Sequence, residues 1–220
     1  MCGRYVLSID PATLSEYFAL DACEPYAPRW NIPPGTDIPV IRRSPEGRRV
    51  AHLLHWGLVP HWAKEASIGQ RLTNARAESV ADKPAFRSAF ARRRCLIPAS
   101  GFYEWQTVGR RKQPYYISLR DGSPLAMAGL WESWTSPTGE VLRSCAIITT
   151  AANALMQPIH DRMPAIIAPQ DWQAWLAAPP EAVSHLLVPF PAEALQAWPV
   201  DGRVSKASND APSLIEPLHT

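Results

Sequence analysis

Residues 95–149 read CLIPASGFYEWQTVGRRKQPYYISLRDGSPLAMAGLWESWTSPTGEVLRSCAIIT, a succession of apolar, β-prone runs with turn sequences between them. Glycine, proline and aspartate mark the turns at Gly109, Asp121-Gly122 and Pro137-Thr138-Gly139. No helical pattern interrupts the series, and strands joined by short turns pair antiparallel. The predicted strands are Cys95–Pro98, Phe102–Thr107, Tyr115–Leu119, Leu125–Trp131 and Val141–Thr149.

The flanking sequence adds shorter elements of both kinds. Asp10 as N-cap and Pro11 in the first turn predict a helix that buries Leu14, Tyr17 and Phe18. The other predicted elements are a strand over Gly3–Ser8, a hairpin of Ile38–Arg42 and Arg49–Trp56, a basic helix near Pro84–Arg93, a strand over Met163–Ile167, helices over Pro169–Leu176 and Glu181–Leu187, and loops over Ala27–Thr36 and Gly57–Arg71. Many short strands with few helices between them predict one largely antiparallel α+β domain over residues 1–220.

The composition is that of a globular protein with unusually many turns. Of 220 residues, 23 are proline, which argues against a helical bundle. No run of 18 apolar residues and no basic region followed by an apolar stretch is present, so neither a membrane span nor a secretory signal is predicted. The four cysteines lack CxxC spacing and are interpreted as reduced thiols of a cytoplasmic protein, without a metal site.

Charge is distributed unevenly along the chain. Residues 1–112 hold 17 Lys and Arg against 10 Asp and Glu, and 18 of the 22 cations in the whole chain are arginine. Arginine suits planar, bidentate contacts with phosphate, and tryptophans are interleaved with it. This pattern indicates a nucleic-acid ligand. The alternative is a solvated surface on which the charges happen to segregate.

The N-terminal sequence Met1-Cys2 has a chemical consequence. Removal of Met1 gives Cys2 a free amine beside its thiol, with ordinary pKa values of about 8 and 8.5. Such a pair can condense with an aldehyde through a Schiff base to a five-membered thiazolidine, which an internal cysteine cannot form. The alternative is that Cys2 only permits removal of Met1 and packs as a small apolar residue.

Further side chains are candidates for chemistry or for phosphate binding. Glu104 lies among aromatic residues, which raise a carboxyl pKa and suit it to moving protons, although an outward-facing strand glutamate is the alternative. His160 can exchange protons near pH 7, or can be an ordinary loop histidine. Asn74 can orient an amine through hydrogen bonds, and Arg76 and Arg162 are candidate phosphate ligands. P-loop, GxGxxG, GxSxG and HExxH sequences are absent.

The ordered motifs MCGRY, RWNIPPGT, HWGLVPHWAK, TNARAES, RCLIPASGFYEW and IHDRMP resemble those of the SRAP (SOS response-associated peptidase) family over nearly the whole chain. The resemblance implies an SRAP-type fold, a barrel-like and mainly antiparallel β core with short flanking helices. It also implies removal of Met1 and covalent trapping of abasic sites in single-stranded DNA, as a thiazolidine crosslink that protects the site during the DNA damage response.

The resemblance assigns roles by motif. Cys2 would be the nucleophile, Asn74 would hold its amine, Glu104 would shuttle protons and His160 would help open the sugar ring. Where some relatives carry two adjacent aromatic residues this chain has His61-Trp62-Ala63, so a stacking role rests on Trp62 alone. The implied DNA contacts are Arg4, Asn31, Pro34, Trp62, Arg76, Trp105, Thr149 and Arg162.

The expected partner is therefore single-stranded DNA with abasic sites, bound by a cytoplasmic monomer that associates with the nucleoid when on DNA. No cofactor, metal or membrane is expected. Two other functions remain open: a cysteine peptidase or N-terminal-nucleophile hydrolase using Cys2, and a module that binds single-stranded DNA without a covalent bond.

Overall fold

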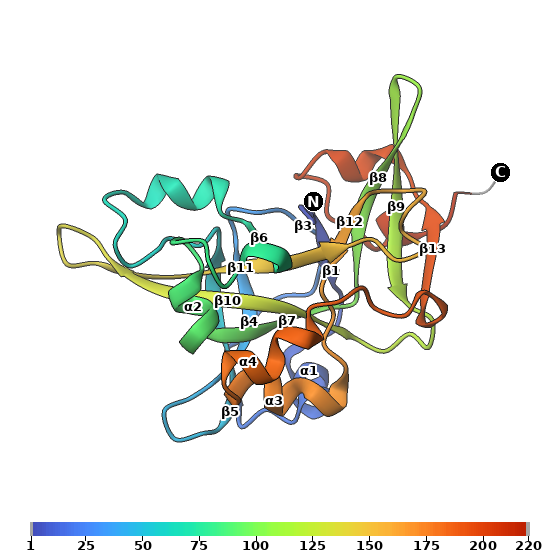
Figure 1. Cartoon of the computed structure of the whole chain (residues 1–220). Coiled ribbons are helices and arrows are strands. Elements are labelled where there is room, and N and C mark those ends of the chain that lie inside the picture. Colours follow the sequence, from blue (N-terminus) through green and yellow to red (C-terminus); the bar gives the residue numbers. More distant parts are fainter. Residues whose placement is uncertain (1, 219–220) are drawn as a thin grey trace.

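A closed ring of strands forms the centre of the computed structural model, which describes residues 2–218 (Figure 1). Strand β11 (Val141–Ala151) pairs with β10 (Leu125–Thr135), and the order continues through β7 (Arg94–Ala99), β4 (Asp37–Arg43) and β5 (Arg49–Trp56). Each of these neighbours pairs antiparallel. Strand β5 then pairs in parallel with β11, where Trp56 lies opposite Cys145, so the ring closes into a barrel.

A second antiparallel sheet carries the N-terminus. Its order is β13 (Leu195–Pro199), β9 (Arg111–Leu119), β8 (Gly101–Val108), β1 (Tyr5–Leu7) and β3 (Arg29–Ile32). Tyr5 of β1 lies opposite Phe102 of β8. A Cβ atom at Gly101 would come within 2.5 Å of the Ile117 carbonyl oxygen and of the Tyr116 ring, so only glycine fits where β8 begins.

Three short strands extend the barrel sheet. These are β2 (Ala22–Cys23) on β5, β6 (Asn74–Arg76) on β11 in parallel, and β12 (Arg162–Pro164) on β11 antiparallel. In these pairings Thr149 of β11 lies opposite both Arg76 and Pro164. Segments from positions 74–76, 149 and 162–164 therefore meet at one end of β11.

Short helices cover the strands. Helix α1 (Pro11–Phe18) begins as the sequence predicts, because the Asp10 carboxylate accepts from the backbone N–H groups of Ala12 and Thr13. The others are α2 (Arg87–Arg92), α3 (Trp172–Ala177), α4 (Pro180–Val183), and the 3-10 helices Ala66–Arg71, Ala77–Ser79, Pro169–Asp171, Ser184–Leu186, Ala192–Ala194, Gly202–Ser205 and Pro212–Ile215. None of the helices within residues 2–218 is both long and apolar enough to cross a bilayer.

The predicted fold class is confirmed: an α+β chain with a mainly antiparallel, barrel-like core and short flanking helices. Several local predictions were wrong. The predicted loop over Ala27–Thr36 contains β3, the predicted loop over Gly57–Arg71 ends in a 3-10 helix, and β13 had no predicted counterpart. The strand predicted over Met163–Ile167 is the shorter β12, followed by an isolated bridge from Ile166 to Met127.

Candidate active site

Cys2 lies where the two sheets meet. The register of β1 against β8, continued back from Tyr5 and Phe102, sets Gly3 opposite Glu104. The Cys2 side chain is fully buried. From the barrel side, Asn74 Nδ2 donates a hydrogen bond to the Cys2 carbonyl oxygen at 2.9 Å. The structure thus brings Cys2, Glu104 and Asn74 together from the segment before β1, from β8 and from β6.

The electrostatics link Cys2 and Glu104. Burial raises the pKa of the Cys2 thiol far above its ordinary value, and the nearby Glu104 carboxylate raises it further. Burial also raises the pKa of the Glu104 carboxyl, whereas the charge of His160 opposes that rise. A neutral thiol beside a carboxyl that holds its proton more tightly than usual follows from this packing.

His160 is oriented by the backbone just before β12. The backbone N–H of Arg162 donates to His160 Nδ1 at 3.0 Å. A backbone N–H can only donate, so Nδ1 is the acceptor and the neutral ring carries its proton on Nε2. Asp161 Oδ1 also lies 3.1 Å from Nδ1 and pairs with it only in a protonated ring. His160 is therefore fixed in orientation, with Nε2 able to donate.

Of the predicted phosphate ligands, Arg162 and Arg4 are already engaged. Arg162 pairs with both carboxylate oxygens of Glu78, at 2.6 and 3.0 Å, and donates to the Thr149 carbonyl oxygen at 2.7 Å. Arg4 donates to Asn31 Oδ1 at 2.9 Å and to the Val204 carbonyl oxygen at 2.8 Å.

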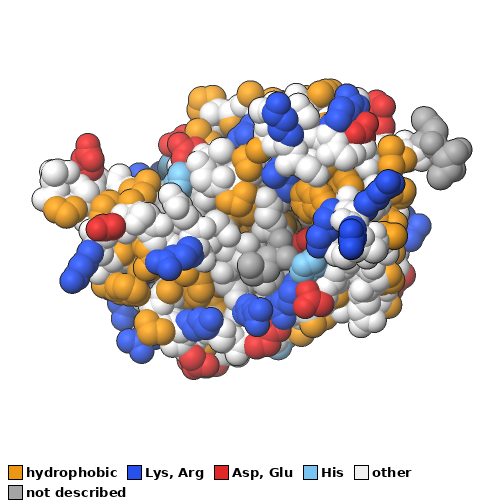
Figure 2. Space-filling model, turned by 90° about the horizontal axis from the view of Figure 1, so that it is seen from above, with side chains coloured by type: hydrophobic (Ala, Val, Ile, Leu, Met, Phe, Trp, Pro, Cys, Tyr) orange, Lys and Arg blue, Asp and Glu red, His pale blue; other side chains and the backbone are white. Residues whose placement is uncertain are grey.

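Arg76, in contrast, is exposed. In Figure 2, which looks onto the molecule from above, Lys and Arg side chains surround the middle of the face, with a histidine beside its central hollow.

Two residues predicted to line a DNA path have no exposed side chain. Thr149 is fully buried in β11. Asn31 is fully buried, and its amide donates to the carbonyl oxygens of Val204, Lys206 and Asn209 at 3.1, 3.2 and 2.7 Å. These bonds fasten residues 204–210, called here the C-terminal strap, across β3.

The other predicted DNA residues lie at the surface or close to it. Trp62 is 51% exposed. Trp105 is half-buried and donates from Nε1 to Ser205 of the C-terminal strap at 3.1 Å. Pro34 is half-buried and lines a small cavity of about 150 Å³ together with Trp56 and Thr73.

Sequence reasoning missed the residues that hold these groups in place. Glu78 lies in the TNARAES motif, two residues after Arg76, but the sequence does not indicate that it pairs with Arg162. Asp210 of the C-terminal strap, which accepts from the Trp30 backbone N–H at 2.6 Å, carried no sequence signal. Gln106 likewise holds the segment before His160, through the Pro158 carbonyl oxygen at 2.9 Å.

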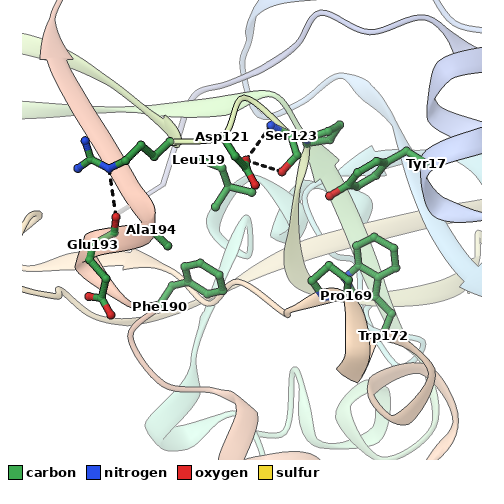
Figure 3. Close-up of a pocket in the computed structure, with 11 residues that line it drawn as sticks. Tyr17, Leu119, Asp121, Ser123, Pro169, Trp172, Phe190, Glu193 and Ala194 are labelled. Carbon is green, nitrogen blue, oxygen red and sulfur yellow. Dashed lines mark hydrogen bonds between the residues drawn. The ribbon is translucent and has the colours of Figure 1, made fainter.

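The surface also carries hollows that do not include Cys2. The hollow in Figure 3, of about 460 Å³, is bordered by Tyr17, Trp172 and Phe190. Its carboxylate Asp121 accepts from Ser123, at 2.9 and 2.7 Å. Within residues 2–218, no group of three or more His, Cys, Asp or Glu side chains lies close enough together to hold a metal ion.

Comparison with known proteins gives consistent matches over nearly the whole chain. The model of the SOS response associated peptidase (SRAP) family matches residues 1–207. The abasic site processing protein YoqW of Bacillus subtilis is 39% identical over 98% of this chain and 99% of its own. The abasic site processing protein YedK of Escherichia coli is 30% identical over 99% and 100%. A crystal structure of a protein from Bacteroides thetaiotaomicron superposes with a TM-score of 0.90 at 26% identity, over 99% of this chain and 100% of that one.

Proposed function

Since the chain belongs to the SOS response associated peptidase (SRAP) family, we propose that it processes abasic sites in single-stranded DNA by bonding to them through Cys2. One observation carries the proposal. Cys2, which follows Met1, is buried near the Glu104 carboxyl of raised pKa, and the oriented His160 acts on that carboxyl. The Asn74 amide donates to the Cys2 backbone carbonyl oxygen. These groups can supply the proton transfers that accompany condensation of an aminothiol with an aldehyde.

The reaction begins with removal of Met1, which lies outside the described residues. The Cys2 nitrogen, until then part of a peptide bond, becomes a free amine. Asn74 Oδ1, buried without a hydrogen-bond partner among residues 2–218, is available to accept one of its N–H groups. His160 donates a proton to the ring oxygen of the abasic sugar while the hydroxyl on C1′ releases its proton to water. The C1′–O bond of the ring breaks and the aldehyde at C1′ is exposed.

The amine attacks C1′, and water leaves as the imine forms. Glu104 supplies a proton to the departing hydroxyl and recovers one from nitrogen. The thiol adds to the imine carbon and its proton passes to nitrogen, which closes the thiazolidine. The balance is aldehyde plus aminothiol giving thiazolidine plus one water. The raised thiol pKa agrees with this order, because the amine reacts first and the thiol is needed only afterwards.

DNA binding in this proposal uses Arg4, Arg76 and Arg162 at the phosphates flanking the sugar. Arg76 is exposed and can bind a phosphate directly, whereas Arg162 would share its guanidinium between Glu78 and the phosphate. We take the protein to act as a monomer and a single domain in the cytoplasm, on DNA that is locally single-stranded.

A cysteine peptidase is the less well supported alternative. Catalytic cysteines of that kind have a lowered thiol pKa, so that the thiolate is present at neutral pH. At Cys2 both burial and Glu104 raise the pKa. A module that only binds DNA has no need for a buried carboxyl beside its second residue.

The test is the intact mass of the protein before and after mixing with a single-stranded oligonucleotide that carries one abasic site. We expect a protein without Met1, and an adduct whose mass is the sum of both components less one water. Cys2→Ser should form no adduct that survives denaturation, while the matched control Cys23→Ser, at a partly exposed cysteine, should form it normally. An unreduced adduct of the same stability in Cys2→Ser would rule out the thiazolidine. Turnover of added peptides without any adduct would favour the peptidase.

A further inference from the structure

A hollow of about 380 Å³ lies on the barrel away from Cys2. It is formed by the end of β4, β10, the end of α2 and the segment between α3 and α4. In Figure 1 α3 and α4 lie below the strands labelled β4, β7 and β10, whereas the N-terminus lies above them. We call it the Trp131 hollow; its lining residues are Arg43, Ser44, Ala91, Arg92, Arg94, Trp131, Leu176, Ala177, Ala178 and Pro179.

The charge of this lining is entirely positive among the described residues. Arg94 is buried and its guanidinium donates to the carbonyl oxygens of Phe90, Trp175 and Ala178, so it contributes charge and holds the wall. Arg43 and Arg92 are exposed at the rim. The acidic side chain that acts on Arg94 is Glu181, which does not line the hollow.

The indole of Trp131 is stacked with a further cation. The guanidinium of Arg42 lies 4.9 Å from the ring centroid. Burial lowers the pKa of Arg42, and the nearby charge of Arg143 lowers it further. Burial also lowers the pKa of His52, and the charges of Arg42 and Arg143 act in the same direction. Glu24 opposes both shifts, and its carboxylate already accepts from the Leu53 backbone N–H at 2.6 Å.

Arg42, Arg143 and His52 do not line the hollow, and Arg42 adjoins it through the Trp131 ring. This cluster has unfilled hydrogen-bonding capacity. Arg42 Nε and His52 Nδ1 are buried without a hydrogen-bond partner among residues 2–218. Like charges that converge in this way repel one another, and an anion between them relieves the repulsion. In the hollow itself, Arg43, Arg92 and Arg94 lie around Trp131. A flat ring next to several arginines is the combination that binds a base together with its phosphate.

We propose that the Trp131 hollow is a second nucleotide-binding site, in which Arg43 and Arg92 bind a phosphate and Trp131 stacks on the base. Its ligand is a nucleotide unit, either free or part of a nucleic-acid strand. The site is separate from Cys2 and does not depend on the covalent reaction. A molecule with both sites binds DNA at Cys2 on one face of the barrel and a nucleotide or a second stretch of DNA on another face.

The test follows the side-chain N–H resonance of Trp131 in a ¹⁵N-labelled sample, identified by its absence in Trp131→Phe. Inorganic phosphate, thymidine monophosphate and an oligothymidylate without abasic sites are titrated separately. We expect a saturable shift, with thymidine monophosphate bound about 10-fold more tightly than phosphate because stacking adds to the phosphate contact. Tighter binding of the oligonucleotide would identify the natural ligand as a strand, and equal binding would identify it as the free nucleotide.

Two double variants, each of which removes two arginine charges, test whether binding depends on the arginines of the hollow. Arg43→Gln/Arg92→Gln should weaken binding of thymidine monophosphate by about 10-fold or more. Arg87→Gln/Arg110→Gln removes two exposed charges, one of them on the same helix α2, outside the hollow and should leave binding unchanged. The proposal is overturned if no ligand moves the Trp131 resonance, if phosphate and thymidine monophosphate bind equally, or if both variants lose affinity to the same extent.

Discussion

Replacing Asn31 by alanine should destabilise the fold rather than remove a contact with DNA. Its buried amide has two N–H groups, which bond to strap carbonyl oxygens at distances down to 2.7 Å, and its Oδ1 accepts from the charged Arg4 at 2.9 Å. A neutral hydrogen bond contributes about 1 kcal/mol net, and one to a charged group about 2 kcal/mol. Asn31→Ala should therefore lower the free energy of unfolding by about 4 kcal/mol, out of the roughly 5–15 kcal/mol typical of a domain.

The assay is urea unfolding followed by tryptophan fluorescence, with the midpoint compared at unchanged m-value. Asn209→Ala is the matched control, because that side chain is half-buried and donates only to the Arg203 carbonyl oxygen at 2.8 Å. The control should lower the free energy of unfolding by about 1 kcal/mol or less. If Asn31→Ala is no more destabilised than the control, yet binds DNA more weakly, the side chain faces the DNA and the reasoning from its burial is wrong.

Three further predictions concern the site. Burial raises the pKa of Glu104 in the folded protein. The protonated carboxyl therefore contributes stability that is full below the unfolded pKa of about 4.3 and is lost as pH rises through the folded pKa. Glu104→Gln should thus melt at a higher temperature than the parent protein at pH 7, and the difference in melting temperature should shrink towards pH 4. His160→Ala should slow adduct formation by about 10²–10⁴-fold, and an oligonucleotide with a permanently open aldehyde should restore its rate but not that of Glu104→Ala; equal rescue of both would refute the division of labour. Neutralising Arg76 or Arg162 should reduce the slope of log affinity against log salt by about 0.7 for each phosphate that is no longer neutralised, and unchanged slopes in both variants would make them ordinary surface charges.

The sequence predicted best where local pattern and final environment agree. The runs between residues 95 and 149 became β7 to β11 because alternating apolar side chains and turn residues suit an antiparallel sheet regardless of what packs on it. Glu104 was placed in apolar surroundings because its neighbours are aromatic, and its raised pKa agrees with that. Its catalytic role stays a prediction.

Prediction failed where a distant segment determines the outcome. Strand β3 lies next to Pro33-Pro34, a pair typical of loops, and it pairs only because β1 and the C-terminal strap lie on either side of it. The ion pair of Arg162 with Glu78 joins two segments that only β11 brings together. No property of either residue alone indicates that partner.

The closure of the barrel also depends on one pairing between distant parts of the chain. Strands β4 and β5 form a hairpin from nearby residues, but the end of β5 at Trp56 finds its partner only at Cys145 of β11. Such non-local pairing is slow, since a long loop must close before any of the new pairing forms. While the chain is being synthesised, the edge of β5 stays open until Val141 and the residues after it emerge. Until then that edge presents unpaired backbone N–H and C=O groups, to which a strand of another chain can add.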